Sequence, residues 1–168
     1  MLKTFYPSSE ADSAYTLAYE ELYEKGYRGI IFDIDNTLVP HGAPATAEAV
    51  VLFAKLRKIG FDTVVVSNNK EPRVKSFADA VQTKYIFKAD KPSKKGYIAA
   101  MKKMGCTPEN TIFVGDQLFT DVWGAKRTGI YSYLVKPIHP KEEIQIVLKR
   151  KLERIVLYFY HRSIHKGE

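Results

Sequence analysis

The distribution of apolar positions along the chain predicts alternating strands and helices. Short runs rich in β-branched residues are separated by segments whose apolar residues recur every three or four positions. This order is typical of a parallel sheet with helical crossovers. We expect strands over 29–33, 62–67, 84–87, 111–115 and 130–135. We expect helices over 13–26, 71–81, 93–104 and 120–128.

One further crossover helix fits the interval between the first two strands. Ala47, Val50, Val51 and Ala54 recur at i, i+3, i+4 and i+7, and Gly60 supplies a stop signal. No internal repeat, low-complexity tract or Gly/Ser linker interrupts the 168 residues. The sequence therefore predicts a single α/β domain over 1–168, a Rossmann-like parallel sheet of about five strands flanked by helices.

Composition indicates which partners and which compartment suit the protein, but it does not identify a function. The formal net charge of +7 favours approach to anions such as phosphate esters, nucleic acid or an acidic lipid surface, although solvated lysines alone also keep a protein soluble. A single cysteine, Cys106, excludes an intrachain disulfide and suits a reducing compartment. Residues 1–26 lack the apolar core of a signal peptide. We expect a cytoplasmic protein or one peripheral to a membrane.

Polar residues follow three of the predicted strands and indicate a site. Asp33, Ser67 and Asp116 each stand where an apolar run ends, and ligands of open parallel sheets bind outside the carboxyl ends of strands. Asp35 follows two residues after Asp33, and Lys91 lies between the second and third of these positions. Acids, a hydroxyl and a lysine in this order are suited to phosphoryl transfer.

Each group has a definite role in that chemistry. Asp33 is the expected nucleophile, because a carboxylate that attacks phosphorus divides one hard displacement into two easier ones. Asp35 would protonate the leaving oxygen and then take a proton from water. Lys91 would neutralise charge on Asp33 and the phosphoryl oxygens, and Ser67 would donate a hydrogen bond to one of them.

The collected negative charge calls for a hard cation. Mg²⁺ prefers carboxylate oxygens, a phosphate oxygen and retained waters. We expect Asp33 and Asp116 to ligate it through their carboxylates and Asp35 through its backbone carbonyl. Asp121 is expected to support these ligands without binding the cation itself.

The motifs resemble the haloacid dehalogenase superfamily of aspartate-nucleophile phosphatases, all four in order between Ile30 and Asp121. More narrowly they are similar to the YqeG subgroup of its type IIIA branch, which is related to phosphatidylglycerophosphate phosphatases. The resemblance implies a phospholipid head group as substrate, Asn68 beside Ser67 and Lys91 in phosphate binding, and Thr37 behind the metal ligands. The matching segments are Phe32–Val39, Val66–Asn69, Ala89–Pro92 and Gly115–Asp121.

Other uses of an acid pair fit less well. A receiver domain places its lysine last, whereas Lys91 precedes Asp116. A calcium loop starting at Asp33 needs Gly at its sixth position and Glu at its twelfth, where this chain has Leu38 and Pro44. The sequence therefore predicts a Mg²⁺-dependent phosphomonoesterase, with phosphatidylglycerophosphate as the favoured substrate. A phosphatase of soluble or nucleic-acid phosphomonoesters, or a basic RNA- or ribosome-binding module with little turnover, stays open as an alternative.

The motif spacing leaves no room for a substantial cap domain. The interval from Asp33 to Ser67 has room for one helix. The interval from Ser67 to Lys91 has room for one helix and a short strand. An open site suits a substrate on a membrane, a polymer end or a protein. The basic residues expected near its rim either contact such an anionic surface or are ordinary helix-surface charge: Lys70, Arg73, Lys94 and Lys95.

A basic amphipathic helix is predicted at about 141–162. Ile144, Leu148, Leu152, Ile155 and Phe159 form an apolar stripe. We expect the first two turns to pack this stripe against the sheet. The segment 155–160 is apolar around the whole helix, which indicates a membrane surface or a partner contact. The basic residues beside the stripe are Lys149, Arg150, Lys151 and Arg154.

Overall fold

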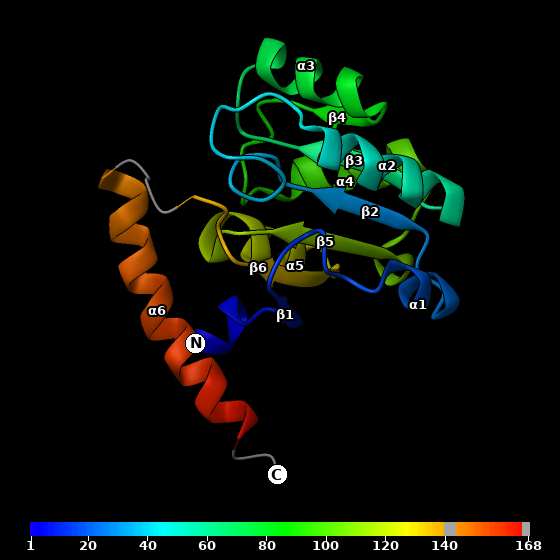
Figure 1. Cartoon of the computed structure of the whole chain (residues 1–168). Coiled ribbons are helices and arrows are strands. Elements are labelled where there is room, and N and C mark those ends of the chain that lie inside the picture. The colour runs from blue at the N-terminus through cyan, green and yellow to red at the C-terminus, as the bar shows by residue number, and fades with distance from the viewer. Residues whose placement is uncertain (140–143, 166–168) are drawn as a thin grey trace.

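The computed structural model describes residues 1–139 and 144–165, except the side chains of residues 144–146. Within them, one parallel sheet has the strand order β1-β6-β5-β2-β3-β4 (Figure 1). Its strands are β1 (Ser9–Ala11), β2 (Gly29–Phe32), β3 (Asp62–Val66), β4 (Lys84–Ile86), β5 (Thr111–Gly115) and β6 (Tyr131–Val135). The helices are α1 (Tyr19–Glu24), α2 (Ala47–Ile59), α3 (Glu71–Val81), α4 (Lys94–Met104), α5 (Trp123–Arg127) and α6 (Ile144–Ile164). Short helical turns are η1 (Leu2–Phe5), η2 (Pro108–Asn110) and the π-helical η3 (Leu118–Val122).

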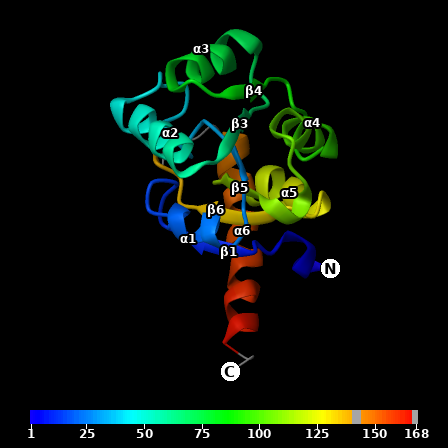
Figure 2. The ribbon, with the colours of Figure 1, turned by 90° about the vertical axis from the view of Figure 1, so that its right-hand side faces the viewer.

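The sheet separates two hydrophobic cores, as the period of two along each strand requires. Ile30 and Phe32 of β2 pack on one face with residues of α1, α2 and α3. Ile31 points to the other face, where α4 and α5 cover it. Figure 2 shows the two helical layers on opposite sides of the sheet. Because both faces are covered, all four residues of β2 are buried.

Helix α2 forms where the sequence predicts, but its buried face was predicted wrongly. Thr46 caps its first turn by accepting a hydrogen bond from the Ala49 N–H at 3.1 Å, and Gly60 ends it with a φ of 120°. Val51 of the predicted stripe is 67% exposed. The helix carries two overlapping apolar faces, and the one with the larger side chains is buried. These buried residues are Ala49, Leu52, Phe53 and Leu56.

The other expected elements are present, with two differences near the N-terminus. β1 was not predicted, because three residues that include Glu10 carry no strand signal. The helix expected over 13–26 is reduced to Tyr19–Glu24. Ser13 instead forms a turn in which its hydroxyl accepts a hydrogen bond from the Tyr15 N–H, which is the side-chain competition that makes serine a poor helix former.

No inserted cap interrupts the described residues. Only α2 lies between β2 and β3, and only α3 and β4 lie between β3 and the segment before α4. The expectation of a cap-free domain is therefore confirmed. None of the helices that the structure describes is long and apolar enough to span a bilayer.

Helix α6 is attached by one face only. Val156 is buried, and Leu157 packs partly, in a small cluster with Leu118, Val122 and Leu134. The predicted stripe faces outward, since Leu148 is 58% exposed, so the expected packing of the first two turns against the sheet is wrong. Residues 141–143 of the predicted helix, and the side chain of Ile144, lie outside the described part.

Candidate active site

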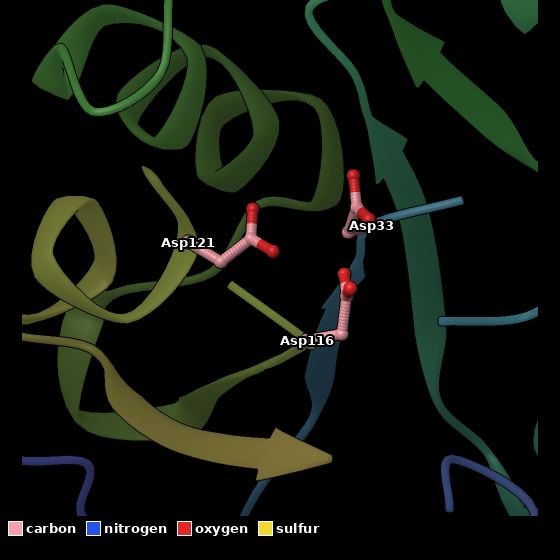
Figure 3. Close-up of side chains that lie close together, drawn as sticks. All are labelled: Asp33, Asp116 and Asp121. Atoms are coloured by element: carbon pink, nitrogen blue, oxygen red, sulfur yellow. The ribbon is translucent and has the colours of Figure 1, made fainter. Parts of the chain in front are cut away.

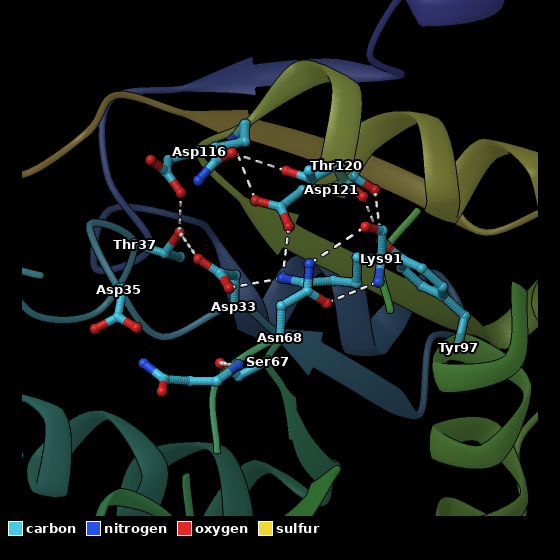
Figure 4. A network of polar contacts seen from close by, with 12 residues as sticks. Asp33, Asp35, Thr37, Ser67, Asn68, Lys91, Tyr97, Asp116, Thr120 and Asp121 are labelled. Carbon is cyan, nitrogen blue, oxygen red and sulfur yellow. Dashed lines mark hydrogen bonds and ion pairs between the residues drawn. The ribbon is translucent and has the colours of Figure 1, made fainter. Parts of the chain in front are cut away.

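Three strand ends bring the predicted polar residues to one place. β2 lies between β5 and β3, so Asp33, Asp116 and Ser67 follow three adjacent strands. The chain winds outward from β2 in opposite directions, through β3 and β4 on one side and through β5 and β6 on the other. This reversal is the position where open parallel sheets bind ligands. All three residues are buried. Figure 4 shows their side chains with the neighbouring polar residues.

Asp33, Asp116 and Asp121 form a carboxylate cluster, with one oxygen of each lying within 4.8 Å of the others (Figure 3). Asp121 reaches it from the π-helical turn η3, a rare geometry that is frequent at functional sites. Gly115 permits the approach, because a Cβ there would lie 2.6 Å from Asp121 Oδ2. Asp121, which was predicted to stand behind the ligands, is thus a member of the cluster.

Lys91 supplies the cluster with positive charge. Its ammonium donates to Asp33 Oδ1 and Asp121 Oδ1, each at 2.7 Å, and its side chain is 3% exposed. Burial alone would lower the pKa of Lys91, but the charges of Asp121 and Asp33 raise it well above its ordinary value. Lys91 therefore stays charged. The peptide bond that follows it, to Pro92, is cis.

Asp116 is held from two sides. Thr37, predicted to support the ligands, donates its hydroxyl hydrogen either to Asp116 Oδ1 at 3.0 Å or to Asp33 Oδ2 at 3.2 Å. Arg150 of α6 donates to Asp116 Oδ2 at 2.5 Å and also to the Asp116 backbone carbonyl. Thr37 and Arg150 together fix the plane of the Asp116 carboxylate.

Glu153 braces this arrangement from α6. One of its oxygens accepts from Arg150 at 3.0 Å, and the other accepts from the Leu118 N–H at 2.9 Å. The pair therefore ties α6 to both ends of the loop that carries Asp116. The sequence predicted Arg150 only as one of the basic residues beside the apolar stripe, and the structure places it inside the site.

The donor set fits a hard divalent cation. Three carboxylates gather while Lys91 and Arg150 provide two positive charges. Burial raises the pKa of Asp33 and, to about 6, that of Asp116, and repulsion by neighbouring carboxylates adds to both shifts. A bound cation would relieve that repulsion, and oxygen ligands are those that Mg²⁺ prefers.

Asp35 lies apart from the cluster. One of its carboxylate oxygens accepts from Arg73 of α3 and from the Gly42 N–H, each at 2.8 Å. Burial would raise the pKa of Asp35, but these hydrogen bonds and the charge of Arg73 lower it below its ordinary value. Arg73 is thereby engaged within the molecule, whereas the side chains of Lys70, Lys94 and Lys95 are exposed.

The second and third motifs support each other. Asn68 accepts from the Lys91 N–H at 2.7 Å and donates to the Lys91 carbonyl at 3.2 Å, so its amide holds the Lys91 segment in place. Ser67 is buried, and its oxygen accepts from the Asn69 N–H at 3.1 Å. The Ser67 hydroxyl hydrogen can therefore be donated to a ligand.

Sequence reasoning did not predict the contacts that four residues make at the site. Arg150, Glu153 and Arg73 make the ion pairs described above, and Tyr97 of α4 donates to the carbonyl of Thr120 or Asp121 at 2.9 or 3.0 Å. One signal was available for the first pair. Glu153 follows three residues after Arg150 and is the only acid between residues 144 and 164.

Comparison with known proteins shows the family to which the chain belongs. The family model described as haloacid dehalogenase-like hydrolase matches residues 46–129. The chain is 35% identical over 167 residues to the probable phosphatase YqeG of Bacillus subtilis, covering 98% of this chain and 97% of that protein. The chain belongs to the haloacid dehalogenase-like hydrolases. It is a phosphatase of that family.

More distant similarities add the fold and a hint of substrate. A phosphatidylglycerophosphate phosphatase of Arabidopsis thaliana is 29% identical over 167 residues, covering 89% of this chain but only 45% of that protein. The solved structure of 3-deoxy-D-manno-octulosonate 8-phosphate phosphatase from Moraxella catarrhalis, in complex with magnesium ion and phosphate ion, matches with a TM-score of 0.54. It shares 16% identity and covers 71% of this chain and 75% of its own. The latter similarity concerns the fold alone.

Proposed function

We propose that this phosphatase is a Mg²⁺-dependent phosphomonoesterase that forms an aspartyl-phosphate on Asp33. The observation that carries the proposal is a buried Asp33 whose carboxylate contacts Lys91 beside two further carboxylates. A carboxylate oriented by a fixed ammonium at a strand end is suited to in-line attack on phosphorus. When bound between Asp33 and Asp116, Mg²⁺ supplies charge neutralisation for the phosphoryl oxygens.

The residues divide the remaining work. Asp33 attacks phosphorus while protonated Asp35 gives its proton to the departing alcohol. Water then gives a proton to Asp35 and attacks the phosphorus of the aspartyl-phosphate, which breaks the bond to Asp33 and releases phosphate. Arg73 keeps Asp35 ionised in the resting site, which suits proton acceptance in the second step. We expect an anionic substrate to compete for Arg73, which raises the pKa of Asp35 and lets it take up from solvent the proton that it donates in the first step.

The favoured substrate is a lipid phosphomonoester, phosphatidylglycerophosphate. Two relatives, from Arabidopsis thaliana and Chlamydomonas reinhardtii, carry that substrate in their names. A cap-free fold places no inserted domain over the site, which suits a head group presented by a membrane. On this proposal the protein works in the cytoplasm at a membrane surface, and the charge of +7 favours approach to anionic lipid.

A substrate panel tests the proposal. Phosphate release with Mg²⁺ is measured on phosphatidylglycerophosphate in mixed micelles, glycerol 3-phosphate, p-nitrophenyl phosphate and a 5′-phosphorylated oligonucleotide. We expect the highest kcat/KM for the lipid and no release by Asp33→Asn. A preference for the oligonucleotide would favour the nucleic-acid alternative, and RNA binding without release from any ester would favour a binding module.

A further inference from the structure

The outward face of α6 carries an apolar stripe that the fold does not use. Leu148, Leu152, Ile155 and Phe159, which we call the outward stripe, are 58%, 57%, 54% and 45% exposed. Their spacing of four, three and four residues places them on one side of the helix. The opposite side holds buried Val156 and the Arg150–Glu153 pair. Attachment of α6 to the domain thus does not depend on the outward stripe.

The charges that surround the outward stripe have one sign. Lys149, Lys151, Arg154 and Arg162 are exposed on α6. Glu153 is the only acidic residue in the sequence from 144 to 164, and it is buried against Arg150. The exposed charged side chains of the described α6 are therefore all basic, and they lie beside large apolar ones.

We propose that the outward stripe binds the surface of an anionic phospholipid bilayer. A helix with an apolar face and flanking basic residues lies in the membrane interface, with the apolar side chains among acyl chains and the cations at lipid phosphates. A second copy of α6 is a poorer partner, because an isologous contact would bring the same basic residues together. Nucleic acid would leave the apolar side chains unused.

Helix α6 lies on the same side of the molecule as the site. Figure 1 shows α6 on the side of the molecule toward which β2 points, the side where Asp33 and Asp116 follow their strands. Arg150 links the inner face of the same helix to Asp116. A bilayer bound to the outward stripe therefore lies on the side of the molecule that carries the site. The inference rests on the surface of α6 and goes beyond the proposed reaction.

Vesicle co-sedimentation of the full-length protein tests the inference. The probes are vesicles of phosphatidylglycerol and phosphatidylcholine, and vesicles of phosphatidylcholine alone. We expect binding to the anionic vesicles that weakens in high salt. Each half-buried leucine or isoleucine has about 1 kcal/mol of burial left to gain, so Leu148→Asn/Leu152→Asn/Ile155→Asn should weaken binding on the order of 100-fold. Lys149→Gln/Lys151→Gln/Arg154→Gln should weaken it on the order of 100-fold at low salt, at roughly 1 kcal/mol for each charge.

Matched changes elsewhere on the surface serve as controls. Val51→Asn with Ile98→Asn removes exposed apolar side chains of α2 and α4, and Lys58→Gln with Lys102→Gln removes exposed charges. Both control variants should bind like the parent protein. Equal binding by the α6 variants, or no binding of the parent protein to anionic vesicles at low salt, overturns the inference, as does a dimer that only the α6 variants dissociate.

Hydrolysis of p-nitrophenyl phosphate, measured on all variants, separates this inference from the proposed function. The substituted α6 side chains take no part in the hydrogen bonds and ion pairs described for the site, so their variants should keep the parent rate in solution. Vesicle binding without hydrolysis contradicts the proposed chemistry alone. Hydrolysis without vesicle binding contradicts the docking inference alone.

Discussion

Lys91→Met should destabilise the metal-free protein by about 4 kcal/mol at pH 7.5. The substitution removes a buried ammonium that lies 2.7 Å from both Asp33 and Asp121, whose side chains are 9% and 1% exposed. Breaking a buried ion pair by removing one partner costs roughly 3–5 kcal/mol, since the remaining charge stays buried and uncompensated. For a protein of this length we expect the melting temperature to fall by about 8–16 °C.

The stability lost on Lys91→Met should become smaller at low pH and in the presence of Mg²⁺. Without Lys91 the pKa of Asp33, already raised by burial, rises further. A raised folded-state pKa adds stability that is fully present below the ordinary carboxyl pKa of about 4 and is lost as pH rises through the folded value. The difference between Lys91→Met and the parent protein should therefore shrink at pH 5. Mg²⁺ at pH 7.5 should also shrink it, because a cation neutralises the same carboxylates.

Thermal and urea unfolding, each at pH 5 and 7.5 and with EDTA or Mg²⁺, measures these differences. Lys95→Met is the matched control, because Lys95 is exposed on α4 and its loss should change stability by less than about 0.5 kcal/mol. With saturating Mg²⁺, Lys91→Met should also lose about 10²-fold or more in kcat. An unfolding free energy equal to that of the parent protein at pH 7.5 in EDTA would refute the reasoning.

The remaining substitutions and conditions test single contacts. Arg150→Met leaves Glu153 and Asp116 without their guanidinium and should lower the free energy of urea unfolding by about 2 kcal/mol. Arg154→Met, at an exposed position, should lower it by less than about 0.5 kcal/mol. Equal losses in the two variants would contradict a role of the Arg150 ion pairs in stability. Asp35→Asn should slow alkyl phosphates more than aryl phosphates, because only poor leaving groups need a proton, and an equal loss in kcat on both would argue against general acid catalysis. The affinity for Mg²⁺, measured by calorimetry, should fall below pH 6, because Asp116 has a pKa of about 6 and must lose its proton to bind the cation. An affinity that does not change between pH 5 and 7.5 would exclude that coupling.

The layout of the sheet and most of the site could be predicted from the sequence because both depend on local signals. β-branched runs identify the central strands, and the polar residues after them meet at one edge whatever the details of packing. Asp33, Ser67 and Asp116 follow that rule, and Asn68 and Lys91 join them through the loops that come next. The three-residue β1 has too few positions for such a signal.

Contacts that depend on tertiary placement could not be predicted in the same way. The sequence of α2 contains two apolar faces, and only packing decides that Phe53 is buried while Val51 is exposed. Arg150 lies 34 residues from Asp116, on a helix whose orientation no local pattern fixes. Basic residues on an amphipathic helix are usually solvated, and the spacing to Glu153 suits Lys149 as well as Arg150, so no local pattern singles out Arg150.

The central claim is that Asp33 carries the phosphoryl group, and trapping of the intermediate tests it most directly. The protein is mixed with Mg²⁺ and p-nitrophenyl phosphate, quenched in acid and reduced with borohydride, which converts an aspartyl-phosphate to homoserine. Peptide mass spectrometry then locates the reduced residue. The mechanism predicts homoserine at position 33 in the parent protein, none in Asp33→Asn, and loss of turnover in that variant. Homoserine at another position, or steady phosphate release by Asp33→Asn, would contradict it.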